Sequence, residues 1–207
     1  MRRLKILLAI VFYFLFSGCN DHQVERCIPG QGIVFDNTKV PVKGDEASPV
    51  ELVIFGDLQC PGTHVLWWRL KILFSKLKKQ EKSAMLKVYF RHFPLSTHNR
   101  ATSAAKAAAA SYLQGNEAFW KMLDLLMKTG DKLTDEHIMT YAANAGLDID
   151  QFEADWKGDS AAKLVSRDYA LAIKLALPGT PASIICGIPI WGTADDVIEN
   201  LEYLLNL

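Results

Sequence analysis

One cysteine stands where the chain could expose a reactive thiol. Cys60 follows a short apolar run, residues 51–55, whose β-branched members predict a buried strand. From Pro61 onward, apolar residues recur at intervals of three and four, which predicts a helix that begins directly after Cys60. The positive end of the helix dipole and the free N–H groups there favour a thiolate, the form of cysteine that attacks disulfides.

The residue that could assist or resolve this thiol is a threonine. Thr63 stands three residues after Cys60, in the sequence Cys60-Pro61-Gly62-Thr63. Its hydroxyl can donate a hydrogen bond to a thiolate, but it cannot form a disulfide. The motif therefore predicts a nucleophile without an adjacent resolving thiol. The alternative is that Cys60 is a buried, inert thiol, because free cysteine is among the most buried residue types.

The N-terminal residues predict export. Three basic residues precede an apolar stretch, residues 6–16, which is too short to span a membrane. It ends in Phe16-Ser17-Gly18-Cys19, which resembles the bacterial lipobox, where a signal peptidase cleaves before a cysteine that carries lipid. An ordinary signal peptide and an uncleaved anchor are the alternatives, and each exports the chain to an oxidising compartment. We expect a lipoprotein signal peptide, a tether and a single domain, over residues 1–18, 19–31 and 32–207.

The remaining cysteines constrain the chemistry. Four cysteines minus an acylated Cys19 leave three, so one thiol is unpaired or bonds another molecule. We interpret Cys186 as a core thiol, since it lies at the far end of a predicted strand, roughly 16 Å from Pro181. Cys27 lies in the predicted tether. A role for Cys27 or Cys186 as a remote resolving thiol is left open.

Composition and charge exclude several function classes. The chain has 23 Lys and Arg against 23 Asp and Glu, and it contains no basic stripe, so we expect no nucleic-acid partner. The five histidines show no metal-ligand spacing, and no glycine-rich phosphate loop is present. We therefore expect neither a metal nor another cofactor.

The order of the elements predicts an α/β fold. Residues 86–93 form a second core strand, and strand, helix, strand at this spacing implies parallel pairing with a right-handed crossover. Residues 182–186 and 188–191 predict a hairpin, followed by a closing helix. The stretch between the two halves is predicted to be helical. Residues 32–35 and 40–42, with a turn at residues 36–38, predict a first strand, and its proline suits an edge position.

A strand followed by Cys-Pro-x-x and a long helix resembles the active-site element of the DsbA-like thiol–disulfide oxidoreductases, in the thioredoxin superfamily. The stretch from Arg91 to Leu95, with the alanine-rich helix after it, looks like the family's second strand and first insert helix. Gly179-Thr180-Pro181 is the most specific match, because the proline at this place in thioredoxin folds is cis and faces the active-site cysteine. The resemblance covers residues 42–204 and implies a thioredoxin-like fold with a helical insertion at about residues 97–177.

The resemblance implies an exported thiol–disulfide exchange protein, tethered to the periplasmic side of a bacterial membrane. Where that family usually has a second cysteine, this chain has Thr63. Isomerase, reductase and deglutathionylation chemistry remain, with protein thiols and disulfides or a small thiol such as glutathione as partners. Thr180 and Pro181 would bind an extended substrate strand beside Cys60. The alternative is a non-catalytic module that keeps the peptide groove.

Overall fold

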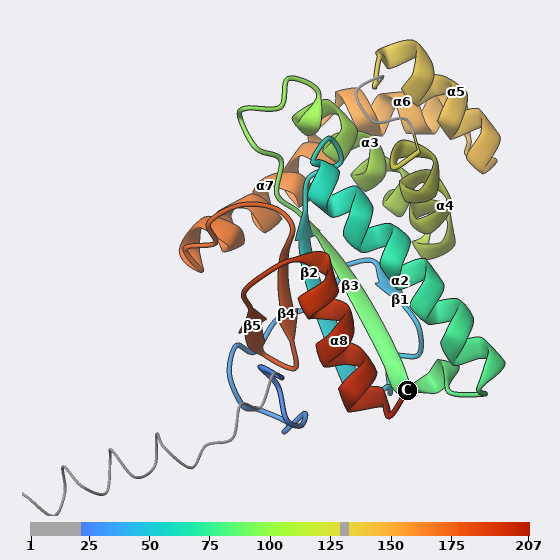
Figure 1. Cartoon of the computed structure of the whole chain (residues 1–207). Helices are drawn as coiled ribbons and strands as arrows, with labels where there is room; N and C mark the ends of the chain where they lie inside the picture. The colour runs from blue at the N-terminus through green and yellow to red at the C-terminus, as the bar shows by residue number, and fades with distance from the viewer. Residues whose placement is uncertain (1–21, 129–132) are drawn as a thin grey trace, which may run out of the picture.

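A five-stranded mixed sheet forms the centre of the computed structural model, which describes residues 22–128 and 133–207 (Figure 1). The strand order is β1–β3–β2–β4–β5. The predicted signal peptide, residues 1–18, and the predicted lipid site Cys19 lie outside the described residues.

The central strands β2 (Val50–Gly56) and β3 (Leu86–His92) pair in parallel along their whole length, as predicted. Their connection consists of helix α2 (Pro61–Lys79) and the short 3-10 helix η1 (Ser83–Met85). On one side the sheet ends at β1 (Val42–Lys43), which is antiparallel to β3. The predicted edge strand is therefore confirmed only near residue 42, and the prediction of a strand at residues 32–35 is wrong. On the other side lie two antiparallel strands, β4 (Ala182–Ile185) and β5 (Ile188–Ile190).

Side chains along β2 alternate between two apolar layers, as the pleat of a strand requires. Leu52 and Ile54 join the layer that includes α2 and the closing helix α8 (Ala194–Leu205), whereas Val53 and Phe55 join the layer on the opposite face. Because both faces of β2 are covered, its sequence is a nearly continuous apolar run. This burial fixes the strand that delivers the chain to Cys60.

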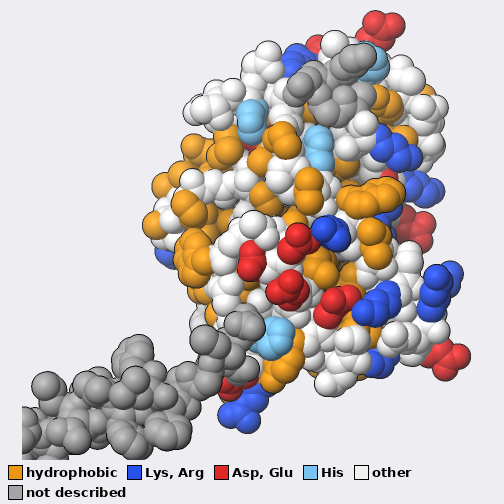
Figure 2. All heavy atoms as spheres, viewed as in Figure 1, with side chains coloured by type: hydrophobic (Ala, Val, Ile, Leu, Met, Phe, Trp, Pro, Cys, Tyr) orange, Lys and Arg blue, Asp and Glu red, His pale blue; other side chains and the backbone are white. Residues whose placement is uncertain are grey.

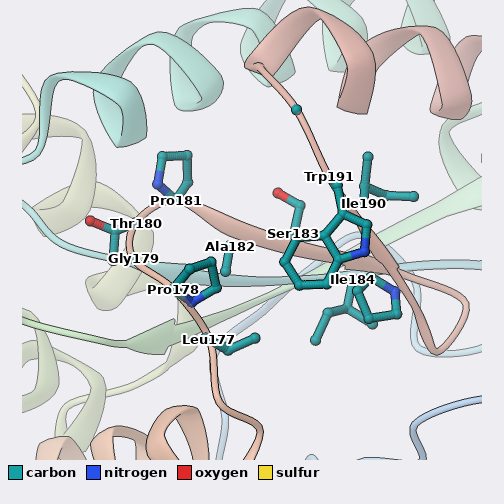
Figure 3. Close-up of a pocket in the computed structure, with 12 residues that line it drawn as sticks. Leu177, Pro178, Gly179, Thr180, Pro181, Ala182, Ser183, Ile184, Ile190 and Trp191 are labelled. Carbon is teal, nitrogen blue, oxygen red and sulfur yellow. The ribbon is translucent and has the colours of Figure 1, made fainter.

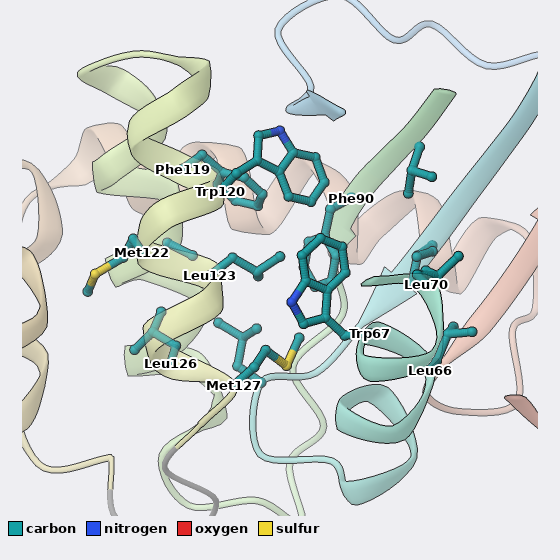
Figure 4. Close-up of a cluster of buried hydrophobic side chains, with 14 of the residues drawn as sticks. Leu66, Trp67, Leu70, Phe90, Phe119, Trp120, Met122, Leu123, Leu126 and Met127 are labelled. Atoms are coloured by element: carbon teal, nitrogen blue, oxygen red, sulfur yellow. The ribbon is translucent and has the colours of Figure 1, made fainter. Parts of the chain in front are cut away.

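A helical block interrupts the sheet between β3 and β4, as predicted. Its five helices are α3 (Ala101–Leu113), α4 (Asn116–Leu126), α5 (Asp135–Ala145), α6 (Ile149–Lys157) and α7 (Asp159–Lys174). The alanines of α3 are buried, and their small side chains let α4, α6 and α7 pack closely around it. Trp67 of α2 stacks on Trp120 of α4 with ring centroids 5.3 Å apart, which joins the block to the active-site helix (Figure 4).

The surface over α2 and α8 mixes charges of both signs (Figure 2). Two ion pairs join these helices, Arg69 with Asp195 and Lys76 with Glu202. In residues 22–128 and 133–207, no helix is long and apolar enough to cross a bilayer.

The N-terminal segment differs from the free tether that the sequence predicts over residues 19–31. The described part of the predicted tether belongs to a longer segment, residues 22–35, which we call the N-terminal strap. The strap lies along the β4–β5 hairpin and α8 (Figure 1). Val24 is fully buried, and its N–H donates to Asn200 Oδ1 at 2.9 Å. The polar composition concealed this docking, because hydrogen bonds and a disulfide provide much of it.

The interpretation of Cys186 as a core thiol is wrong, because Cys186 forms a disulfide with Cys27. Cys186 and Gly187 form the turn of the hairpin, with φ values of 49° and 81°. Cys186 therefore lies just beyond β4, against the strap rather than in the core. The bonded residues are 159 positions apart, so spacing along the chain could not reveal the pair. The bond also removes both cysteines as free resolving thiols.

Candidate active site

Cys60 occupies the N-cap of α2, directly before Pro61 at the first helical position. Its N–H donates to Asp57 O at 3.1 Å, and its own carbonyl accepts the first helical bond from His64 N–H. The predicted junction of strand and helix is thus confirmed. Cys60 is the free cysteine of the described chain, and it is only 9% exposed. A small part of its surface is therefore open to a partner.

The loop before β4 meets this cysteine, as predicted. The Thr180–Pro181 peptide bond is cis, and the Cys60 thiol donates a hydrogen bond to Thr180 O at 3.1 Å. Gly62 makes the approach possible, because a Cβ at this position would lie 2.9 Å from Pro181 Cδ. The first turn of α2 and the cis-proline loop are therefore in close contact around the thiol.

Thr63 could donate a hydrogen bond to a Cys60 thiolate, but among the described residues no hydrogen bond joins the two side chains. Thr63 is buried, and its Oγ1 accepts from Asp57 N–H at 3.4 Å. Its methyl group packs near Gly56, where a Cβ would lie 3.1 Å from Thr63 Cγ2. The side chain therefore fixes the turn that precedes Cys60 instead of contacting the sulfur.

Asp57 is a site residue that sequence reasoning missed. Its buried carboxylate accepts from Gln59 N–H at 2.7 Å, from Leu95 N–H at 2.8 Å and from His98 Nδ1 at 2.8 Å. These bonds tie the turn before Cys60 to the loop after β3. An acidic residue directly after an apolar strand was the available signal, since a buried carboxylate needs several donors.

Gln59 and His64 complete this turn from either side of Cys60. The Gln59 side chain accepts from Arg100 N–H and donates to Asn99 Oδ1 at 3.3 Å. His64 Nε2 lies 2.7 Å from Leu58 O. Side chains thus hold the backbone before and after Cys60, which leaves the thiol in one fixed position.

Three further buried polar side chains, Arg91, His92 and Asp168, lie at the same end of the sheet. Arg91 donates to Asp168 Oδ1 at 2.9 Å, and the other Asp168 oxygen accepts from His92 N–H at 3.1 Å. His92 lies edge-on to Phe90 and Phe119, and burial lowers its pKa from 6.5 to about 4, against the opposing effect of Asp168. Its imidazole is therefore neutral at pH 7.

A groove runs from the cis-proline loop toward the end of β5, with a cavity volume of about 270 Å³ (Figure 3). Leu177, Pro178 and Ile190 give it apolar walls, and Trp191 lies on its rim. Thr180 and Ser183 also line the groove, and their buried hydroxyls have no hydrogen-bond partner within the described part of the chain. An extended peptide could place one residue at Cys60 and a neighbour in this groove.

Within the two described ranges, no group of three or more His, Cys, Asp or Glu side chains is arranged to hold a metal ion. The chemistry available at the site is that of Cys60 itself, with Thr180 and Pro181 as a platform for a bound strand.

A thioredoxin-like sheet that brings one cysteine against a cis-proline is the architecture of the thiol–disulfide oxidoreductases. This chain belongs to the family of DSBA-like thioredoxin domains, whose family model matches residues 51–206. The matched region contains Cys60, the helical block and the cis-proline loop. Both the predicted family and the predicted fold, thioredoxin-like with a helical insertion, are confirmed.

Individual relatives agree with the family. A solved structure of the thiol-disulfide exchange protein alpha-DsbA2 from Wolbachia pipientis has a TM-score of 0.70 and 26% identity, and the match covers 82% of this chain and 88% of that one. A probable disulfide bond formation protein D of Bacillus cereus is 27% identical over 151 residues, which cover 70% of this chain and 68% of that protein.

Another similar protein is much longer. The Na(+)/H(+) antiporter NhaA 1 of Mycolicibacterium gilvum is 35% identical over 149 residues, which cover 70% of this chain but 23% of the antiporter. This chain therefore spans less than a quarter of that protein, and the similarity carries no argument for ion transport.

Proposed function

We propose that this chain is an exported thiol–disulfide exchange protein that works with Cys60 alone. The separation of the cysteines carries the proposal. Cys60 is free and lies against Thr180 and the cis-proline, whereas Cys27 and Cys186 are bonded to each other. Cys186 is also distant, since five residues of strand beyond Pro181 extend roughly 16 Å. A mixed disulfide at Cys60 therefore depends on a thiol from another molecule.

In the proposed reaction, the Cys60 thiolate attacks one sulfur of a substrate disulfide. A bond forms between Cys60 and that sulfur, the substrate bond breaks, and the other substrate sulfur leaves as a thiolate. A second thiolate then attacks the mixed disulfide and restores Cys60. If it belongs to the substrate, a disulfide is moved without net oxidation. If two small thiols such as glutathione act in turn, they are oxidised to a disulfide and the substrate is reduced.

The same chemistry removes glutathione from a protein thiol. Cys60 attacks the sulfur of the glutathione, the protein leaves as a thiolate, and a second glutathione releases oxidised glutathione from Cys60. A dithiol oxidase cycle is not part of the proposal, because Thr63 cannot close a disulfide with Cys60. The chain would therefore act as an isomerase, a reductase or a deglutathionylating protein.

Thr180 and Pro181 would bind the substrate. Thr180 O already accepts a bond from the Cys60 thiol, so a strand that pairs with this backbone passes beside the sulfur. Backbone pairing of this kind gives affinity with little dependence on sequence, while adjacent pockets select side chains. Pro61 and Gly62 complete the surface around the sulfur, and Gly62 leaves room for the loop.

Export and anchoring are part of the proposal. The Cys27–Cys186 disulfide fits an oxidising compartment such as the periplasm. The described hydrogen bonds of the strap start at Gln23, four residues after Cys19. Four residues reach at most about 14 Å. A lipid on Cys19 would therefore hold the domain directly against the periplasmic face of a membrane.

One observation favours a second candidate function, a module that binds peptides without redox turnover. Cys60 is 9% exposed, which is low for a nucleophile that must meet a protein disulfide. In that case the cis-proline loop and the groove would hold an extended segment and Cys60 would remain a thiol. The reactivity of Cys60 decides between the two functions.

The deciding experiment traps mixed disulfides. Protein is taken from its native compartment with thiols blocked, and the wild type is compared with Cys60→Ser and Thr63→Cys. We expect adducts with proteins or glutathione at Cys60, seen on non-reducing gels and by mass spectrometry. They should vanish in Cys60→Ser and be scarcer in Thr63→Cys, because a cysteine one helical turn away can resolve them. A free, alkylation-resistant Cys60 without adducts would leave the binding module as the better proposal.

Anchoring has its own test. The wild type should fractionate with membranes and carry lipid on Cys19, and Cys19→Ala should be released or remain unprocessed. A soluble wild-type protein that begins at a residue other than Cys19 would contradict the lipid anchor without affecting the proposal for Cys60.

A further inference from the structure

Trp191 lies at the groove near the cis-proline loop, directly after the end of β5. It follows the last residue of β5, Ile190, and its side chain is 61% exposed. The indole lies on the rim of the groove, across from the loop that contains Pro178 and Pro181 (Figure 3). A large apolar side chain that is left in water at a groove that begins at the cis-proline loop is a candidate contact for a bound peptide.

The backbone of Trp191 is held by the strap. Gln23 Nε2 donates to Trp191 O at 2.8 Å, and Trp191 N–H donates to Gln23 Oε1 at 3.0 Å. The amide of one side chain thereby satisfies both backbone groups of Trp191, as a neighbouring strand would. Residues 168 positions away in the sequence thus set where β5 ends and where the indole lies.

The strap is itself fixed at several points after Gln23. Val24 is buried and bonded to Asn200 of α8, and Cys27 is covalently joined to Cys186 at the hairpin turn. Farther along, Ile33 N–H donates to Gly187 O at 2.8 Å. The strap therefore holds the β4–β5 hairpin at its turn and at its end.

We propose that the disulfide-bonded strap positions the substrate groove, with Gln23 as a positioning residue and Trp191 as a specificity-determining residue. Trp191 would contact a large apolar or aromatic side chain that lies near the reactive cysteine of an extended peptide. The disulfide limits the freedom of the strap before any substrate arrives, so less ordering is required on binding. This inference rests on the proposed function, because it assumes that substrates bind beside Cys60.

The test compares two peptide probes. Both are nine-residue peptides whose single cysteine is activated as a mixed disulfide with 2-nitro-5-thiobenzoate; one has Phe two residues from the cysteine and the other has Ser. The rate of chromophore release by Cys60 is measured for each, and their ratio is the selectivity. Because the ratio compares two substrates of one variant, a general loss of folded protein or of thiol reactivity does not change it.

We expect the wild type to prefer the Phe peptide and Trp191→Ala to lower the selectivity about tenfold, the size of a typical aromatic contact. Gln23→Ala should lower it less, and Gln23→Glu, which keeps the acceptor for Trp191 N–H, should recover part of the loss. Cys27→Ser/Cys186→Ser should resemble Gln23→Ala. Trp68→Ala is the matched control, because Trp68 is 63% exposed on α2 and lies outside the groove.

An unchanged selectivity in Trp191→Ala, or an equal loss in Trp68→Ala, would overturn the inference while leaving the proposed function intact. If Cys60 releases the chromophore from neither peptide, the proposed function fails. Binding of fluorescein-labelled peptides with Ser in place of Cys then decides the inference alone. Preferential loss of affinity for the Phe peptide in Trp191→Ala supports it, and equal affinities contradict it.

Discussion

The two ends of the central sheet hold their cysteines by different means. At the end that carries Cys60, buried polar side chains fix the backbone: Asp57, Gln59, Thr63, Arg91 and Asp168. At the end that carries Cys186, a disulfide to Cys27 and backbone bonds to the strap fix the hairpin. The first arrangement leaves the Cys60 thiol free of a disulfide, whereas at the second end Cys186 is bonded in a disulfide.

The difference shows what each end can do. Buried polar groups are costly unless every partner is in place, so they hold a local conformation accurately but depend on their surroundings. A disulfide stabilises mainly by restricting the unfolded chain, and it needs no polar network. The proposed catalytic end therefore depends on hydrogen bonds around Cys60, and the opposite end depends on one covalent link.

The largest expected effect comes from removing that link. Cys27→Ser/Cys186→Ser should lower the free energy of unfolding by about 5 kcal/mol, because the lost cross-link closes a very long loop. Cys60→Ser should cost about 1 kcal/mol or less, since a serine hydroxyl can donate the same bond to Thr180 O. Urea denaturation of both variants measures the difference. Equal losses would mean that the two ends do not differ in this way.

The next largest loss of stability should come from breaking the buried ion pair between Arg91 and Asp168. Asp168→Asn should cost about 4 kcal/mol, because it leaves the Arg91 guanidinium buried without its carboxylate. Glu153→Gln removes an exposed ion pair with Lys157 and should cost well under about 1 kcal/mol. Replacing both buried partners, by Arg91→Met/Asp168→Leu, should cost less than Asp168→Asn alone. If the double variant is the less stable, the pair itself stabilises the Cys60 end.

Local patterns were sufficient to predict most of the fold. The apolar run of β2 and the periodicity of α2 predicted the position of Cys60. The cis bond at Pro181 came from family resemblance, because no local pattern specifies it. These features depend on residues that are close in sequence or on a motif.

The contacts that could not be predicted from the sequence join residues far apart in the chain. The Cys27–Cys186 bond and the Gln23–Trp191 pair depend on how the strap crosses the hairpin, which no spacing encodes. The hydrogen bond that Thr63 could donate to Cys60 is also not formed in the described part of the chain. Its hydroxyl bonds to the nearer Asp57 N–H, and only the folded turn reveals that competition.

Acid should lower the free energy of unfolding through His92, which lies at the Cys60 end of the sheet. His92 has a pKa of about 4 in the folded protein because it is buried, against 6.5 when unfolded. Between these values the unfolded chain binds a proton that the folded protein does not, so the free energy of unfolding falls as the pH decreases. The loss reaches on the order of 3 kcal/mol below pH 4. His92→Leu should flatten this acid limb in pH-dependent urea titrations.

The smallest expected effect tests how closely the cis-proline loop must approach Cys60. In Gly62→Ala, the new Cβ would lie 2.9 Å from Pro181 Cδ, so the loop must move by a few tenths of an ångström. Alanine favours the helix by about 1 kcal/mol, and the crowding costs a similar amount, so stability should change by no more than about 1 kcal/mol. Reaction of Cys60 with a peptide disulfide should nevertheless slow several-fold, because the strand-binding backbone of Thr180 moves away from the sulfur.

Gly179→Ala is the matched control in the cis-proline loop, where a Cβ meets nothing within 4 Å. Equal rates for the two variants would mean that the contact between α2 and the loop is structural and that substrates reach Cys60 by another route.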